Sequence, residues 1–173
     1  ADIANSYVWI VLLSLCGMAG IGLADDWQKI KLANSRGVSA KQKFICQLAV
    51  AALVACALYF QDDFSTRLSV PFFKKLLPDL GIMYIPFVIF VIAGATNAVN
   101  LTDGLDGLAI GLVLIVSATY LLFSYITGHA GLSEYLKVFR IAGAGELTVF
   151  CGAMVGAGMG FLWYNSHPAQ IFM

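Results

Sequence analysis

The sequence is organised around the stretch Asn97-Ala-Val-Asn100-Leu-Thr-Asp103-Gly-Leu-Asp106-Gly-Leu-Ala109, which lies between two long apolar runs. Its polar residues at 97, 100, 103 and 106 are spaced by three, so on a helix they remain neighbours on one face. Ionisable groups at membrane depth are costly, and they indicate a functional site when they face a cavity or the interior of a helix bundle. The stretch therefore predicts a polar binding surface on one helix face. A polar loop between two helices is the structural alternative.

The composition around this stretch is that of an integral membrane protein. Of the 173 residues, 60% are hydrophobic and 12% are charged, whereas soluble domains are about 45–50% apolar and about 25% charged. The net charge is zero, which gives no indication of a nucleic-acid partner. The four cysteines lie inside apolar runs without a CxxC spacing, so neither a zinc site nor a disulfide framework is predicted.

Hydropathy predicts five membrane-spanning helices, each close to the ~20 residues that a bilayer requires. They are expected at Tyr7 to Ala24, Phe44 to Phe60, Ile82 to Ala98, Leu108 to Thr127 and Leu147 to Tyr164. The expected fold class is an all-α polytopic membrane protein, with residues 1–173 as a single transmembrane domain. Ser39 and Gln42 form a capping-box pattern before the second helix. Pro71 and the turn Pro78-Asp-Leu-Gly81 predict a short hairpin between the second and third helices.

Counting the crossings places three polar segments on one membrane face. Two spans separate Asp25-Asp26 from Asp103 and Asp106, and two more separate these from Asn165-Ser-His-Pro168. The hairpin and the loop 128–146 are expected on the other face. Each face carries five basic residues, so the positive-inside rule does not orient the chain by count. The basic residues of the acidic face are concentrated in one short loop, which weakly favours the cytoplasm for that face.

Asp25, Asp26 and Lys29 form a pattern that suits phosphoryl transfer. Carboxylates at a helix end suit Mg²⁺, which takes oxygen ligands, waters and substrate phosphates. Lys29 follows the aspartates by three and four residues, on the same side of a helical turn, where it can meet a phosphate. Phosphoryl transfer requires mainly positioning and charge neutralisation. A solvated helix terminus is the structural alternative, although acidic residues are unfavourable near a helix C-terminus.

Other polar and small residues are expected to be structural. His129 and His167 are expected at the surface, with His167 also a candidate to line the site on the acidic face. Gly152, Gly156 and Gly160 form consecutive GxxxG steps, which predict close helix packing and not catalysis.

Three segments resemble the signature segments of the bacterial phospho-N-acetylmuramoyl-pentapeptide transferases, a family of the polyprenyl-phosphate N-acetylhexosamine-1-phosphate transferase superfamily. They are Gly22-Leu-Ala-Asp25-Asp26-Trp-Gln-Lys29, the central stretch, and Gly160-Phe-Leu-Trp-Tyr-Asn165-Ser-His-Pro-Ala-Gln-Ile-Phe-Met173. Their order and separation also fit, and the resemblance covers essentially the whole chain. The run Asn-Leu-Thr-Asp-Gly-Leu-Asp-Gly favours the muramoyl-pentapeptide branch.

The resemblance implies an enzyme of the bacterial inner membrane that contributes to cell-wall synthesis. It would transfer phospho-MurNAc-pentapeptide from UDP-MurNAc-pentapeptide to undecaprenyl phosphate, giving lipid I and UMP, with Mg²⁺ as the required cofactor. The resemblance also implies a homodimer whose active site faces the cytoplasm. Only the acidic face can then be cytoplasmic, which makes the hairpin periplasmic.

The resemblance also assigns roles to individual residues. Asp25 and Asp26 are the candidate catalytic residues, the first as a base or an orienting group for the lipid phosphate and the second beside the metal and the diphosphate. Asp26 and Asp103 are the candidate metal ligands within the chain. Lys41 and Lys43 would face phosphates. The candidate substrate-binding residues are Lys29, Asn97, Asn100, Asp103, Asp106, Asn165 and Phe172.

The chain departs from the family in its length. Family members are about twice as long and have about ten spans, and a Gly-Asp pair that supplies a direct magnesium ligand would follow Phe172-Met173. We therefore expect this chain to be a fragment of a roughly ten-helix enzyme and to be inactive alone. The alternatives are a UDP-GlcNAc:polyprenyl-phosphate GlcNAc-1-phosphate transferase, a non-catalytic membrane scaffold and a cation carrier. Carrier sites usually lie near the bilayer midplane, whereas these acids lie at span ends.

Overall fold

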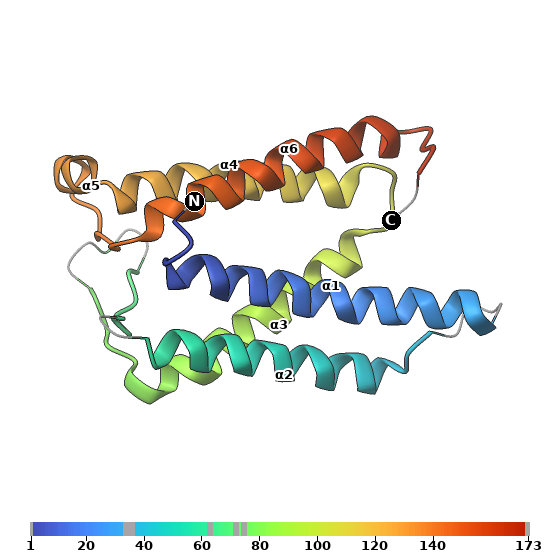
Figure 1. The fold of residues 1–173 in the computed structure, drawn as a ribbon, viewed down its shortest axis with the longest axis horizontal. Helices are drawn as coiled ribbons and strands as arrows, with labels where there is room; N and C mark the ends of the chain where they lie inside the picture. The colour runs from blue at the N-terminus through green and yellow to red at the C-terminus, as the bar shows by residue number, and fades with distance from the viewer. Residues whose placement is uncertain (1, 33–36, 62–63, 71–72, 74–75, 172–173) are drawn as a thin grey trace. The chain divides into compact units, whose positions relative to one another are not determined.

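The computed structural model describes the whole chain except residues 1, 33–36, 62–63, 71–72, 74–75 and 172–173. The contacts divide the chain into two compact units, one formed by Trp9–Ala95 and the other by Ala1–Val8 with Thr96–Met173. The described residues form α-helices and short 3-10 helices (Figure 1): α1 (Ser6–Leu32), α2 (Ala40–Tyr59), η1 (Gly81–Met83), α3 (Tyr84–Thr102), α4 (Leu108–Gly128), α5 (Ala130–Leu136), η2 (Ala144–Glu146) and α6 (Leu147–Asn165).

Five helical segments of the described chain are long and apolar enough to cross a membrane. They are Ser6–Lys31, Ala40–Tyr59, Gly81–Thr102, Leu108–Gly128 and Ala144–Asn165. Each overlaps one of the five predicted spans, so the prediction of an all-α polytopic membrane protein is confirmed.

Helix α1 continues two turns beyond the span predicted for it. Its 27 residues, at 1.5 Å per residue, extend over about 40 Å, whereas the hydrocarbon core of a bilayer is about 30 Å thick. About 20 residues suffice to cross that core, and counting from Ser6 they end at Asp25. Asp25, Asp26 and Lys29 therefore lie on the last two turns of the helix, at and beyond the end of such a 20-residue span, and not in the connecting loop.

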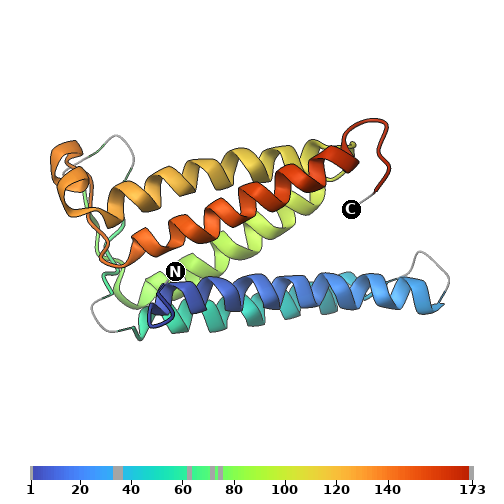
Figure 2. The same cartoon turned by 45° about the horizontal axis from the view of Figure 1, so that its top comes forward.

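Helices α1 and α2 lie side by side within their unit (Figures 1 and 2). They approach closely at Gly17, where a Cβ atom would lie 2.7 Å from Cγ1 of Val50. The predicted N-cap of α2 is confirmed, because the Ser39 hydroxyl accepts a hydrogen bond from the Gln42 N–H. The same hydroxyl donates to Oε1 of Gln42 at 2.9 Å, so Ser39 satisfies two groups at the start of the helix.

The segment between α2 and α3 reverses direction through an isolated antiparallel bridge between Arg67 and Asp79. The Asp79 carboxylate accepts hydrogen bonds from the Thr66 hydroxyl and the Gly81 N–H. The Thr66 hydrogen bond in particular holds the pKa of the Asp79 carboxyl below its ordinary value. The predicted hairpin thus takes the form of a single bridge in the described part of this segment, and Pro71, one of its predicted turn residues, lies outside the described residues.

Helices α4 and α6 lie side by side in the other unit, with α5 and η2 between them in the chain (Figures 1 and 2). The glycine that brings them together is Gly158, where a Cβ atom would lie 2.8 Å from Cδ2 of Leu114. The predicted GxxxG ridge contributes only Gly152 to this contact, with a Cβ position 3.6 Å from Leu121, while no described atom lies within 4 Å of a Cβ at Gly156. The closest approach to α4 is therefore at Gly158, which is not a member of the predicted ridge, and the ridge takes part only through Gly152.

Replacing Gly158 with leucine should weaken the packing of α6 on α4, because even the first added carbon meets Leu114. Overpacking of a filled site costs about 1–3 kcal/mol. The matched substitution Gly156→Leu adds the same side chain where the described structure leaves space, so it should lower the melting temperature less. Thermal unfolding of both variants in detergent, followed by circular dichroism, measures the difference. Equal melting temperatures would contradict the assigned packing.

Candidate functional site

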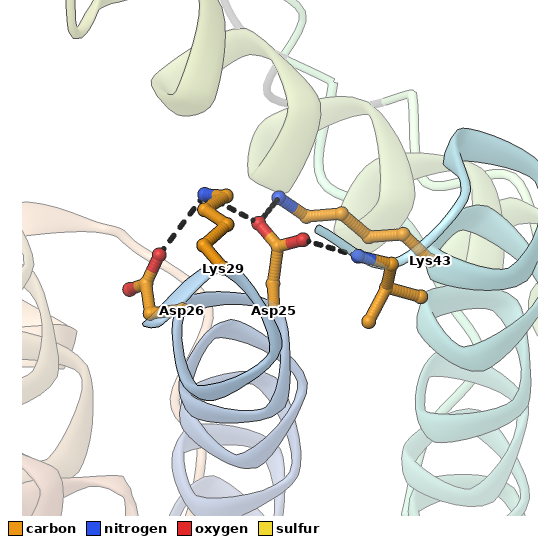
Figure 3. A network of polar contacts seen from close by, with 5 residues as sticks. Asp25, Asp26, Lys29 and Lys43 are labelled. Carbon is orange, nitrogen blue, oxygen red and sulfur yellow. Dashed lines mark hydrogen bonds and ion pairs between the residues drawn. The ribbon is translucent and has the colours of Figure 1, made fainter. Parts of the chain in front are cut away.

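The predicted site residues form two polar clusters, one in each unit of the chain. The first cluster surrounds Asp25, which is 7% exposed at the end of α1. Its Oδ2 atom lies 2.9 Å from Nζ of Lys29 and 3.5 Å from Nζ of Lys43. Its Oδ1 atom accepts a hydrogen bond of 2.9 Å from the Val38 N–H. Both carboxylate oxygens are therefore engaged, by two ammonium groups on one side and by the backbone on the other (Figure 3).

Asp26 is the exposed member of this cluster. Its side chain is 68% exposed, and Oδ1 lies 3.0 Å from Nζ of Lys29. Lys29 thus contacts both aspartates, as its spacing of three and four residues predicts. The last turn of α1 also carries Lys31, and cations at this helix end offset the unfavourable position of the two acids. Lys41 is exposed and takes no part in the described ion pairs of this cluster.

The four polar residues of the central stretch divide between a helix and a turn. Asn97 and Asn100 lie in the last turns of α3. Asp103 and Asp106 follow the end of the helix and are both exposed. The prediction that all four share one helix face is therefore wrong, and the alternative of a polar loop describes its second half.

Local backbone preferences explain why α3 stops. The Thr102 hydroxyl donates back to the carbonyls of Ala98 and Val99, and the Gly104 N–H donates to the Thr102 carbonyl in a tight turn. Gly107 then adopts a φ of +77°, a left-handed conformation that suits glycine, immediately before α4 begins. The polar spacing therefore does not set the backbone of the stretch, which turns after Thr102 and passes through the left-handed Gly107.

Asn165, at the end of α6, connects this turn to the segment that follows α6. It is 6% exposed. Its Oδ1 accepts from the Gly107 N–H at 3.1 Å, and its Nδ2 donates to the Ile171 carbonyl at 2.8 Å. The amide therefore uses both of its ends to hold two backbone segments that are distant in sequence.

Asp106 adds a second link between the same two segments. Its Oδ2 accepts a hydrogen bond from the Ala169 N–H at 3.3 Å. The same oxygen lies 3.4 Å from Nδ1 of His167, whose side chain is 86% exposed. The structure thus confirms that His167 is at the surface and places it beside a predicted site residue. Phe172, the predicted aromatic of this cluster, lies outside the described residues.

The donor sets of the clusters are compatible with a magnesium ion bound together with substrate. Among the described residues no group of three or more His, Cys, Asp or Glu side chains forms a preassembled metal site. Magnesium commonly takes only one or two carboxylates and completes its shell with waters and substrate phosphates. The exposed carboxylates of Asp26 and Asp103 offer oxygen ligands of this kind.

Sequence reasoning missed the backbone groups that complete both clusters. These are the N–H groups of Val38, Gly107 and Ala169, each of which donates to a predicted site side chain. A backbone donor carries no signature in the residue type at its position. In the sequence, the glycines at 37 and 107 could have indicated these backbone contacts, because glycine permits close approach of the backbone.

The fold and the clusters define a multi-pass helical membrane protein with acidic, amide and basic groups at the ends of its helices. The family model for Glycosyl transferase family 4 matches residues 8–173, and the chain belongs to this family.

Curated relatives match over the same length. The chain is 58% identical over 173 residues to a phospho-N-acetylmuramoyl-pentapeptide-transferase of Pelobacter propionicus. This match covers 100% of the chain and 48% of that relative. Proteins of the same name from Citrifermentans bemidjiense and Solidesulfovibrio magneticus are 56% and 52% identical, over 100% and 99% of the chain and 48% of each relative. The resemblance found in the motifs is confirmed, and the chain spans about half the length of these relatives.

Proposed function

We propose that the full-length protein containing this chain transfers phospho-MurNAc-pentapeptide from UDP-MurNAc-pentapeptide to undecaprenyl phosphate, forming lipid I and UMP. The observation that carries the proposal is the identity of 52–58% over essentially the whole chain with relatives that bear the transferase name. The predicted site residues that the structure describes lie at helix ends and turns, and Asp26, Asp103 and Asp106 are exposed there, where charged substrates can reach them from water.

In this reaction the first cluster, called the α1 cluster and formed by Asp25, Asp26, Lys29 and Lys43, would bind phosphates. The side chain of Lys29 is 40% exposed and that of Lys43 is 28% exposed, so both are partly open to an anion. The engagement of both Asp25 oxygens favours the orienting role for this carboxylate over the role of a base. Asp26, with its exposed carboxylate, is the better placed of the two aspartates to meet a metal-bound diphosphate.

The second cluster, called the turn cluster, consists of the polar residues of the central stretch together with Asn165. It would hold the nucleotide part of the substrate. Asn97, Asn100, Asp103 and Asp106 supply hydrogen-bonding groups to the substrate, and Phe172 supplies an aromatic face for uracil. Asp103 and Asp106 are exposed on the turn, which supports this assignment. The Asn165 amide is used internally, which supports an indirect role in which it shapes the turn.

We include Mg²⁺ as the cofactor, with Asp26 and Asp103 among its carboxylate ligands. When bound, the ion would neutralise charge on the diphosphate and on the leaving UMP. The residues of this chain would bind the substrate, orient its phosphates and offset their charge. We also propose that the protein acts as a homodimer in the bacterial inner membrane, with both polar clusters on the cytoplasmic side.

Membranes containing the full-length protein test these proposals. We expect UMP release that requires UDP-MurNAc-pentapeptide and undecaprenyl phosphate together, that stops on chelation with EDTA, and that returns on addition of Mg²⁺. Unlabelled UDP-GlcNAc should compete poorly with the labelled substrate. Strong competition, or turnover of UDP-GlcNAc itself, would replace the proposal with a GlcNAc-1-phosphate transferase. Absence of UMP release from well-folded protein would favour a scaffold or a cation carrier.

A further inference from the structure

The connection between α1 and α2 approaches Asp25 with its backbone. Val38 directs its N–H at Oδ1 of Asp25, 13 residues away in the sequence, over 2.9 Å. Gly37, the residue before it, also lies directly against the carboxylate. A Cβ atom added to Gly37 would overlap Oδ1 of Asp25 and would lie 3.0 Å from both Cγ of Asp25 and Cε of Lys29.

This steric limit distinguishes Gly37 from the other glycines at this end of α1. No described atom lies within 4 Å of a Cβ built on Gly20 or Gly22, so an alanine fits at either position and also raises helix propensity. At Gly37 the carboxylate or the loop must move to admit an alanine. Because Asp25 is 7% exposed and bound on both oxygens, a shift of its carboxylate breaks contacts that are already made.

We propose that Gly37 is a positioning residue of the α1 cluster. Its missing side chain lets the Val38 N–H hold one oxygen of Asp25, and this fixes the other oxygen where Lys29 and Lys43 converge on it (Figure 3). Lysine ammonium groups sit on flexible four-carbon stems, so they do not stay together without a fixed anion. The glycine acts on the two lysines through Asp25 and contacts no substrate. The reaction that these lysines serve is taken from the proposed function, whereas the positioning of the lysines by Gly37 does not depend on it.

Amine labelling of the full-length protein in native membranes tests this inference without any turnover. A brief acylation, followed by peptide mass spectrometry, reports the accessibility of each lysine, with exposed Lys41 as the internal reference. We expect Gly37→Ala to raise the labelling of Lys29 and Lys43 several-fold relative to Lys41. The matched control Gly20→Ala should leave both unchanged, because it adds the same methyl group in open space.

The same substitution made in Asp25→Ala protein separates an effect that passes through Asp25 from a general loss of structure. Asp25→Ala should raise the labelling of both lysines by itself, and Gly37→Ala should then add nothing at Lys43, because the atoms that it would meet on Asp25 are gone. Lys43 is the readout of this comparison, since the added methyl group would still lie 3.0 Å from Cε of Lys29. If Gly37→Ala alone does not fold, the double variant should fold as well as Asp25→Ala does.

Two results would overturn the proposal. One is unchanged labelling of Lys29 and Lys43 in folded Gly37→Ala protein. The other is an effect of Gly37→Ala, on the labelling of Lys43 or on folding, that persists in full in the Asp25→Ala background. Neither result depends on UMP release, so the transferase proposal and this inference succeed or fail separately.

Discussion

Replacing Asp25 with asparagine in the full-length protein should lower the rate of UMP release on the order of 10²-fold, the loss that misplacement of substrate-positioning groups can cause. Asparagine has the same size, and its Oδ1 can still accept the hydrogen bond from Val38. It lacks the negative charge on which Lys29 and Lys43 converge. The variant therefore tests the charge of Asp25 while its shape and its backbone contact are retained.

The chain offers a close control for this substitution. Asp79 also accepts one hydrogen bond from a backbone N–H and has a side-chain partner, the Thr66 hydroxyl, but it lies in the hairpin segment. Asp79→Asn should retain most of the UMP release, measured in the same membranes and normalised to the amount of folded protein. If Asp25→Asn keeps the parental rate, or if the two variants lose activity equally, Asp25 has no special place in the reaction.

The sequence predicted the helices well because a bilayer imposes strict limits on length and polarity. Each span must supply about 20 apolar residues and satisfy its own backbone, so hydropathy alone located all five. The Ser39 cap and the contacts of Lys29 with both aspartates were also predictable, because they depend on spacings of three and four residues along one helix.

The prediction went wrong where backbone conformation overrides side-chain spacing. The spacing from 97 to 106 is helical, but the helix ends at Thr102, the Gly104 N–H turns back to the Thr102 carbonyl, and Gly107 takes a left-handed conformation before α4. The contacts of Asn165 with Gly107 and Ile171 were not predictable either. One of them joins residues 58 positions apart, and both use backbone groups that every residue type offers.

These contacts make Asn165→Ala the variant with the largest expected effect on the turn cluster. Truncation removes the partner of the Gly107 N–H and of the Ile171 carbonyl, and each lost hydrogen bond costs about 0.5–1.5 kcal/mol. We expect a lower melting temperature, faster hydrogen exchange at the Gly107 N–H and loss of UMP release. Asn100→Ala is the matched control, because Asn100 is exposed on α3. As a proposed substrate-binding residue it should lose activity without a change in melting temperature.

The substitution Asn165→Asp keeps one of the two hydrogen bonds and removes the other. The new carboxylate still accepts from the Gly107 N–H, so exchange at that amide should stay slow, but it cannot donate to the Ile171 carbonyl and instead repels it. If activity falls in this variant while Gly107 stays protected, the segment after α6 is what Asn165 must hold in place for the reaction. If activity is retained, the turn between α3 and α4 is the part that matters. If Asn165→Ala and Asn100→Ala have the same melting temperature, the Asn165 amide does not hold the turn cluster together. Asn165 is then again a candidate for direct contact with the nucleotide.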